Sequence, residues 1–320
     1  MVCSTIHSVC ERYQMVNSWL RAIGFYRGFF IVSFIPASIG LLMALRDGHP
    51  FSSLHFSLAL LGIWAFHIGT NLINDYYDYL FKTDVINKVQ TPFSGGTRVI
   101  IDGLLRAESV RNVAIASFAI GFIPLLILSY SIGLPVLLLA VTGCFSGYFY
   151  SAPPFKFAYR GLGELFIGLN FGPFILATSY FSQAQAISTD ALIVSVVMGL
   201  FSAAIITVNE FPDYEADKET GKNNLIVRWG LEGGIGLYRF IIYSAFCFIL
   251  LCIVSGILPT VSALSIPLLL RAEMIARRLH SSPQDVNVMT ASSAGTIQVF
   301  VLTWLVLSGG LIYEIWKGMD

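Results

Sequence analysis

The sequence predicts an all-α integral membrane protein with nine transmembrane helices, and three observations support this: composition, apolar runs and charge distribution. Of its 320 residues, 56% are hydrophobic and only 12% are charged, whereas a soluble domain carries roughly 25% charged residues. The apolar runs are long and continuous, unlike the short alternating segments of a membrane β-barrel. We therefore expect residues 1–320 to form one membrane-embedded domain. Residues 1–18 lack the apolar region of a signal peptide, so we expect a short cytoplasmic segment there.

Nine apolar spans can be placed along the chain. They cover 21–44, 54–74, 112–133, 134–150, 163–182, 190–209, 237–256, 258–271 and 293–315. The eighth is short for a transmembrane helix, so a tilted or interfacial segment is the alternative. Gly133–Pro135 and Gly256–Pro259 each join two spans, and these residue types predict tight hairpins.

The basic residues test this order of spans. With the N-terminus in the cytoplasm, four connections lie on the cytoplasmic side: 75–111, 151–162, 210–236 and 272–292. These connections, their ends and the N-terminal region hold every Lys and Arg except Arg46 and Lys317. That asymmetry follows the positive-inside rule. It predicts a C-terminus outside and a multi-pass protein of the cell (inner) membrane.

A first polar motif, NLINDYYDYLFKTD, ends the second span at residues 71–84. If the helix continues to about residue 80, four side chains share one face, because they are spaced i, i+3, i+4 and i+7: Asn71, Asn74, Asp75 and Asp78. Asp84 follows shortly after. Polar residues in a membrane span usually face the bundle interior, and carboxylate and amide oxygens suit Mg²⁺. A solvated helix end would explain one such motif equally well.

A second motif makes that simpler explanation insufficient. The sixth span ends in VNEFPDYEADKETGKNNLIVRWG, residues 208–230, and NDYYDY at 74–79 aligns with NEFPDY at 209–214. The offset equals four spans, which predicts an internal repeat with motifs at 71–84 and 209–217.

The spacing of the second motif has its own consequences. Asn209, Asp213 and Asp217 are spaced i, i+4 and i+8, which predicts one helical stripe. Pro212 lies inside it and predicts a kink or a helix restart. Each motif is followed by a basic, Gly-containing segment, at 91–100 and 220–230. Lys and Arg there suit diphosphate oxygens, although membrane topology alone also places basic residues on this side.

These motifs, with YFYSAPPFKFAYRGLGELFIGLNFGP at residues 148–173, resemble the UbiA-type superfamily of intramembrane aromatic prenyltransferases over nearly all of the chain. The resemblance implies a nine-helix bundle around a central cavity and Mg²⁺-dependent transfer of an isoprenoid from its diphosphate. NLINDYYDYxxxTD and SGGTRVI are most similar to the 1,4-dihydroxy-2-naphthoate branch of menaquinone synthesis. Two features depart from the pattern: Lys82, where that branch commonly has Gly, and RAIGFYRGFF, which lacks an Arg-Pro dipeptide.

The resemblance also implies roles for individual residues. The metal would be held by Asn74, Asp75, Asp78, Asn209, Asp213 and Asp217. Candidates for contact with the substrates are Asn71, Arg98, Lys156, Lys222, Arg228 and, for the acceptor, His67. Asp78 or Asp84 is the candidate base. The rings of Tyr148 and Tyr150 are candidates to stabilise an allylic cation.

Other functions stay open on the sequence. The same chemistry could use 4-hydroxybenzoate, a chlorophyllide, haem or a glycerol-ether lipid as acceptor. An ion-coupled transporter is the alternative from another class, but its acidic sites usually lie near the bilayer midplane. Here the acids lie at helix ends beside Lys and Arg. The expected partners are a prenyl diphosphate, an aromatic acceptor and lipid, and no nucleic acid.

Overall fold

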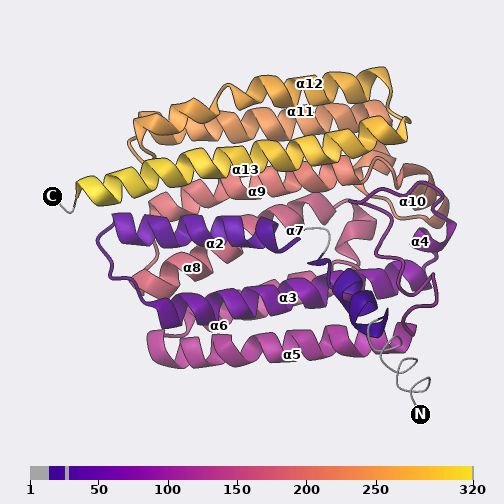
Figure 1. Ribbon diagram of the computed structural model, residues 1–320, viewed down its shortest axis with the longest axis horizontal. Coiled ribbons are helices and arrows are strands. Elements are labelled where there is room, and N and C mark those ends of the chain that lie inside the picture. The colour runs from indigo at the N-terminus through magenta and orange to yellow at the C-terminus, as the bar shows by residue number, and fades with distance from the viewer. Residues whose placement is uncertain (1–13, 26–28, 319–320) are drawn as a thin grey trace, which may run out of the picture.

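A computed structural model describes residues 14–25 and 29–318. It is a bundle of long helices that run roughly parallel or antiparallel to one another (Figure 1). Within the described residues there is no β-strand, so the all-α prediction is confirmed. Of the predicted N-terminal segment, only residues 14–18 belong to the described part, where they begin a helix that covers 14–22.

The long helices in chain order are α2 (Phe29–Arg46), α3 (Ser53–Leu80), α5 (Ala107–Ile132), α6 (Pro135–Tyr148), α9 (Thr189–Asn209), α11 (Leu225–Val254) and α13 (Val286–Lys317). Between α6 and α9 lies one interrupted helix, built from α7 (Gly163–Leu169), the π-helical η3 (Asn170–Phe174) and α8 (Ile175–Ala184). The short helices near the ends of α3, α6 and α9 are α4 (Thr83–Ile86), the 3₁₀-helix η2 (Phe157–Arg160) and α10 (Tyr214–Thr220). The 3₁₀-helix η4 (Thr260–Ser265) and α12 (Leu268–Ser281) precede α13.

Six helices are long and apolar enough to cross a membrane, and two shorter apolar helices accompany them within the described residues. The chain is therefore an integral, multi-pass membrane protein. The predicted span 258–271 does not form one regular apolar helix, because η4 and the charged, amphipathic α12 take its place. The charges of Arg271, Glu273 and Arg277 prevent α12 from being an apolar span. Both predicted hairpins are present, with Gly133 at φ 114° and Gly256 at φ 73°.

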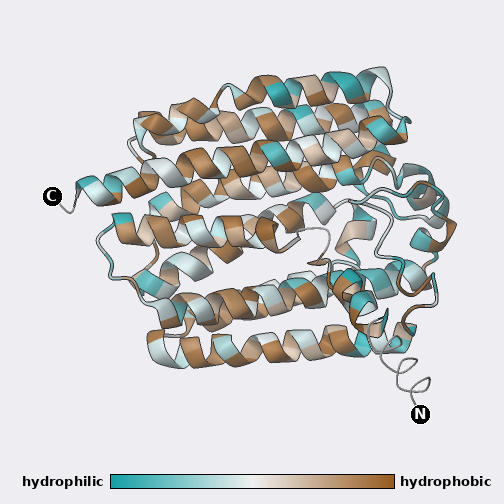
Figure 2. Cartoon of the chain, in the orientation of Figure 1, coloured by the Kyte–Doolittle hydropathy of each residue, from teal (hydrophilic) through white to brown (hydrophobic). Residues whose placement is uncertain are grey.

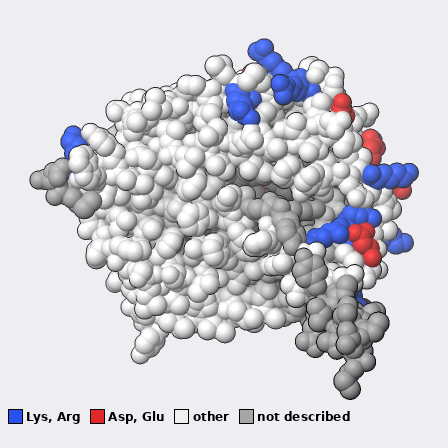
Figure 3. Space-filling view, in the orientation of Figure 1, with Lys and Arg blue, Asp and Glu red and all other residues white. Residues whose placement is uncertain are grey.

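The bundle has one polar end. Helices α4 and α10 lie there, whereas the C-terminal end of α13 lies at the opposite end (Figure 1). Hydrophobic residues dominate the long helices and hydrophilic ones gather in the connections at the α4–α10 end (Figure 2). On the face shown in Figure 3, Lys and Arg concentrate toward this same end. The connections that follow both acidic motifs therefore meet at the polar end of the bundle.

Apolar packing divides the bundle into two groups of helices. The larger core joins α2, α8, α9, α11, α12 and α13, and smaller cores join α3 with α5 and α6. The interrupted helix lies between the groups and packs closely on α9. A Cβ on Gly172 would lie 2.5 Å from the carbonyl oxygen of Ser195, so only glycine allows this approach. Close packing on α9 leaves the opposite side of the interrupted helix to face α3 and α6, where a cavity lies.

Candidate active site

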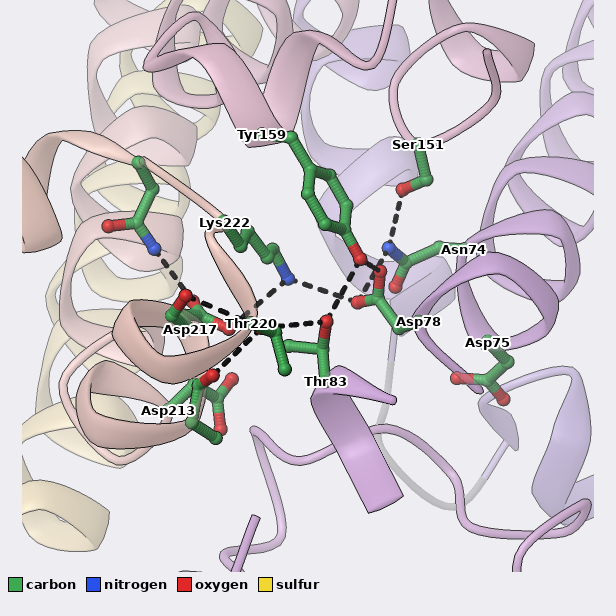
Figure 4. A network of polar contacts seen from close by, with 12 residues as sticks. Asn74, Asp75, Asp78, Thr83, Ser151, Tyr159, Asp213, Asp217, Thr220 and Lys222 are labelled. Carbon is green, nitrogen blue, oxygen red and sulfur yellow. Dashed lines mark hydrogen bonds and ion pairs between the residues drawn. The ribbon is translucent and has the colours of Figure 1, made fainter. Parts of the chain in front are cut away.

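Lys222 connects the two acidic motifs (Figure 4). Its Nζ lies 3.0 Å from Oδ2 of Asp78, at the end of α3, and 3.7 Å from Oδ1 of Asp217, on α10. Gly221, at φ 75°, ends α10 and turns the chain so that the lysine points back into the cluster. Burial opposes the charge of Lys222, but Asp217 and Asp78 outweigh it and hold its pKa well above the usual value. The two motifs therefore share one buried cation.

Asp78 collects further hydrogen bonds because α3 continues to Leu80, as predicted. Its Oδ1 accepts a 2.7 Å bond from the hydroxyl of Tyr159, which lies 3.0 Å from Oγ1 of Thr83. Its Oδ2 accepts a 3.2 Å bond from Asn74, whose amide also donates to Ser151 at 2.7 Å. These contacts fix the carboxylate of Asp78 between α3 and the segment that follows α6.

Asp75 lies on the same helix but faces another part of the chain. The backbone N–H of Thr97 donates to its Oδ1 at 3.2 Å, and the Thr97 hydroxyl donates to Oδ2. Asp84, on α4, lies against Gly96, where a Cβ would come within 1.9 Å of its Oδ2. Burial, and next the charge of Asp78, raise the pKa of Asp84 well above its usual value. The Gly-rich loop after the first motif thus closes over Asp75 and Asp84.

The second motif does not form the single stripe that its spacing predicts. Helix α9 ends at Asn209 and α10 restarts at Tyr214, so the predicted interruption at Pro212 is confirmed and the continuous stripe is wrong. The turn instead directs Asp213 toward the loop of the first motif. Asn87 donates to its Oδ1 at 2.7 Å, and burial raises the pKa of Asp213 to about 6.

Several buried oxygens at this junction have no hydrogen-bond donor among the described residues. They are Oδ1 of Asn209, Oε2 of Glu210, Oδ1 of Asp217 and Oε2 of Glu164. Burial, and next the charge of Glu164, raise the pKa of Glu210 well above its usual value. Buried oxygens without donors are costly and mark places where a cation or substrate can supply the missing interaction.

The donor set suits a divalent cation that arrives with its substrate. Among ion pairs of the described residues, Lys222 is the one basic side chain paired with the motif carboxylates, which outnumber it. No three acidic, His or Cys side chains in residues 14–25 and 29–318 stand close enough to hold a metal by themselves. Mg²⁺ usually needs only one or two carboxylates and completes its shell with water and phosphate oxygens. Hard oxygen donors in excess of positive charge therefore fit such an ion.

Three other predicted phosphate contacts lie around this cluster and engage the protein itself. Lys156 Nζ lies 3.4 Å from the ring centroid of Phe81, and burial lowers its pKa. Arg98 bonds to the carbonyl of Asp84 at 3.4 Å. Arg228 donates to the carbonyl of Arg160 at 2.7 Å. Of these three, Lys156 is the one whose charged group is not bound to a protein oxygen in the described part of the chain.

A cavity extends from the cluster between α3, α6 and the interrupted helix. Tyr150 and His67 both line it; burial, and next the charge of Glu210, raise the pKa of Tyr150. Tyr148 does not line this cavity and packs against Phe118 at 6.1 Å between ring centroids. Asn71 is partly exposed on α3 and is likewise outside the cavity lining.

The sequence motifs did not identify the residues that orient the carboxylates. Tyr159 binds Asp78, Asn87 binds Asp213, Thr97 binds Asp75 and Asn224 donates to Asp217 at 2.8 Å. None of them has a distinctive spacing from its partner. Three nevertheless lie in stretches that were already prominent: FKFAYR, SGGTRVI and TGKNN.

A buried acidic site beside a cavity, inside a bundle of membrane-spanning helices, defines a class of protein: an integral membrane protein with a polar site at one end of an apolar bundle. A profile of the UbiA prenyltransferase family matches residues 33–294. The chain belongs to the UbiA prenyltransferase family, and it is a prenyltransferase.

Individual relatives agree with this assignment. The 1,4-dihydroxy-2-naphthoate octaprenyltransferase of Bacillus subtilis is 25% identical over 224 residues, which are 70% of each chain. The 2-carboxy-1,4-naphthoquinone phytyltransferase of Synechocystis is 28% identical over 273 residues, covering 84% of this chain and 85% of that one. A solved UbiA homologue from Archaeoglobus fulgidus, bound to DMAPP and Mg²⁺, matches 91% of this chain and 99% of its own with a TM-score of 0.61 at 15% identity. At that identity the solved structure supports the fold alone.

Proposed function

We propose that this enzyme transfers a polyprenyl group from its diphosphate to 1,4-dihydroxy-2-naphthoate, a step of menaquinone synthesis. The single observation that carries the reaction type is the meeting of both acidic motifs on Lys222 beside the cavity. The naphthoate is supported by the relatives, since those from Bacillus subtilis and Mycobacterium leprae are 1,4-dihydroxy-2-naphthoate octaprenyltransferases. They are 25% and 24% identical to this chain.

The proposal includes the arrangement in the membrane. The chain would form nine spans, the eighth an amphipathic one built from η4 and α12, with the N-terminus in the cytoplasm and the C-terminus outside, in the cell (inner) membrane. The motifs at 71–84 and 209–217 would then be equivalent ends of two four-span repeats in one domain. The concentration of Lys and Arg at the α4–α10 end supports a cytoplasmic active site, because basic residues favour that side.

The diphosphate would bind at the acidic cluster. Asn74, Asp75, Asp78, Asn209, Asp213 and Asp217 are the proposed holders of Mg²⁺, which neutralises the charge that develops on the leaving group. Lys222 and Lys156 are the proposed direct contacts to phosphate oxygens, because Lys222 already faces both motifs and Lys156 lies at their edge. Arg98 and Arg228 would act indirectly, by holding the loops that they bond.

The reaction would exchange one bond for another. The C–O bond between the prenyl carbon and diphosphate breaks, the electron pair leaves with diphosphate, and the prenyl carbon becomes cationic. A ring carbon of the acceptor attacks it, and the ring then releases CO₂ or a proton. The ring of Tyr150 lines the cavity where this cation would form, and aromatic faces attract cations. Asp78 or Asp84 is the candidate base, and His67 is a candidate acceptor contact.

The test is an assay of purified protein with Mg²⁺ and a long-chain prenyl diphosphate. The acceptors would be 1,4-dihydroxy-2-naphthoate, 4-hydroxybenzoate, a chlorophyllide, haem and a glycerol-ether lipid. We expect prenylated naphthoate as the main product, detected by mass spectrometry. If another acceptor alone were prenylated, that acceptor would take the place of 1,4-dihydroxy-2-naphthoate in the proposal. If no acceptor led to release of diphosphate, the proposed chemistry would be refuted.

A further inference from the structure

Two cavities lie one after the other along α6. The first begins at Tyr150 and continues past Thr70 and Ser146 toward Ile63 and Ile175. The second lies between α6, α8 and α9 and is lined by apolar side chains, apart from Tyr180 and Ser188. Leu139, half-buried on α6, lines both cavities and therefore forms part of the partition between them.

We propose that Leu139 is the residue that determines how long an isoprenyl tail the enzyme accepts. A long tail would pass from the first cavity over Leu139 into the second, whereas a short tail would end before it. This inference rests on the proposed function, since it needs a prenyl diphosphate whose head group lies at the acidic cluster.

The covalent structure of the donor dictates where its tail begins. A diphosphate held by Lys222 and the motif carboxylates must send its prenyl chain away from the polar end. The first cavity adjoins the cluster, because Thr70 and Tyr150 line it, and Asn74, one turn after Thr70 on α3, donates to Ser151 beside Tyr150 at 2.7 Å. The tail would therefore enter this cavity directly from the reacting carbon.

The first cavity is polar near the reaction and apolar farther away. Ser146 donates to Oδ1 of Asn170 at 2.8 Å, and both side chains line this cavity with His67. An acceptor with polar substituents matches that half. Farther from the cluster, Leu125, Leu139 and other apolar residues take over. This gradient separates the space for the ring from the space for the tail.

The length of the prenyl tail decides which of the two cavities its end reaches. From Gly147 to Leu139, α6 rises roughly 12 Å, and from Leu139 to Pro135 roughly 6 Å more. A geranyl chain ends within the first stretch, whereas a chain of many isoprene units reaches Leu139. Beyond it, Leu138, Ile187 and Leu192 line the second cavity and are 58%, 72% and 40% exposed on the lipid-facing surface. A long tail can leave there into the bilayer, where apolar surface is stable.

The test compares two donors of different length with one acceptor. Leu139→Trp would fill the partition while leaving the acidic cluster intact. Because the indole would occupy the space through which a long tail passes, we expect kcat/KM for octaprenyl diphosphate to fall at least about tenfold. The value for geranyl diphosphate should stay within about twofold of the unmodified enzyme, since its chain ends before residue 139. The matched control is Val141→Trp, since Val141 is on α6, exposed, and lines neither cavity.

A second variant tests the same passage from the facing wall. Ala177, on α8, lines the second cavity, so Ala177→Phe should reproduce the loss with the long donor even if Leu139→Trp does not fold. If folded variants at Leu139 and Ala177 affected both donors equally, the role of Leu139 would be overturned and the proposed function would stand. If the unmodified enzyme used neither donor, the proposed function would fail, and this inference with it.

Discussion

The two acidic motifs have similar sequences but build their halves of the site differently. The first lies on a continuous helix, α3, which carries Asp75 and Asp78 to Leu80 without interruption. The second is divided, since α9 ends at Asn209 and Asp213 lies in the turn before α10. Similar spacing therefore does not give similar geometry. On the continuous helix α3, Asp75 and Asp78 bind different partners. In the interrupted second motif, the carboxylates face the first motif.

This difference makes each half depend on the other. Asn87 and the N–H of Gly95 belong to the loop after the first motif, yet they bind Asp213 of the second at 2.7 and 3.4 Å. Lys222 comes from the second half and binds Asp78 of the first. Two motifs that share partners in this way form one site, and neither motif alone holds a complete set of partners.

The largest expected effect tests whether both halves are needed. Asp78→Asn and Asp213→Asn should each lower kcat at least about 10²-fold, because each removes a negative ligand of the Mg²⁺ that would neutralise the departing diphosphate. The control is Glu215→Gln, an exposed acid within the second motif, which should keep near-normal activity. Steady-state assays with equal amounts of folded protein measure this. Near-normal turnover by either Asp variant would show that one motif suffices.

A smaller effect tests the break in the second motif. Pro212→Ala should lower kcat/KM about tenfold, because the turn that directs Asp213 to Asn87 is no longer preset, and small misplacements of catalytic groups are expensive. Pro259→Ala, in the hairpin at the opposite end, is the control. If Pro212→Ala kept full activity, the proline would be dispensable for directing Asp213.

Loss of a hydrogen bond that orients Asp78, in the first motif, should have a weaker effect on activity. Tyr159→Phe removes one hydrogen bond to its carboxylate, a loss of about 0.5–1.5 kcal/mol, so we expect a two- to tenfold rise in the KM for the prenyl diphosphate. Tyr180→Phe removes a 2.8 Å bond of the same kind to Asp47 and should leave KM unchanged. Equal effects of the two substitutions on KM would mean that Tyr159 acts on stability alone.

The smallest expected effect concerns Lys82, the position where the naphthoate branch of the family commonly has Gly. This residue has φ 65°, the left-handed region, directly after α3. Lys82→Gly should raise the free energy of unfolding by about 0.5 kcal/mol, because relief of strain exceeds the added entropy of the unfolded chain. Lys88→Gly, at an exposed position without positive φ, should lower it instead. Thermal unfolding in detergent would compare the stability of the two variants. A Lys82→Gly protein less stable than the unmodified one would show that Lys82 is not strained.

The sequence by itself determined the class of fold and predicted the kind of site. Long apolar runs require helices, because backbone groups in lipid must be hydrogen-bonded within their own segment. Matched acidic motifs at the ends of two spans predict a cation and diphosphate site. The tight hairpins at Gly133 and Gly256 and the interruption at Pro212 followed from residue types with restricted or permissive backbones.

The tertiary structure decided which groups meet. Lys222 lies 144 residues after Asp78 and Tyr159 lies 81 residues after it, and no local periodicity connects positions so far apart. The eighth predicted span is irregular, and the single stripe in the second motif was wrong, for a related reason. Hydropathy and spacing assume one regular helix, whereas the chain interrupts it in both places. Leu139 became a specificity candidate only when two cavities were seen to share it, because a cavity belongs to the packing of several helices and not to any one of them.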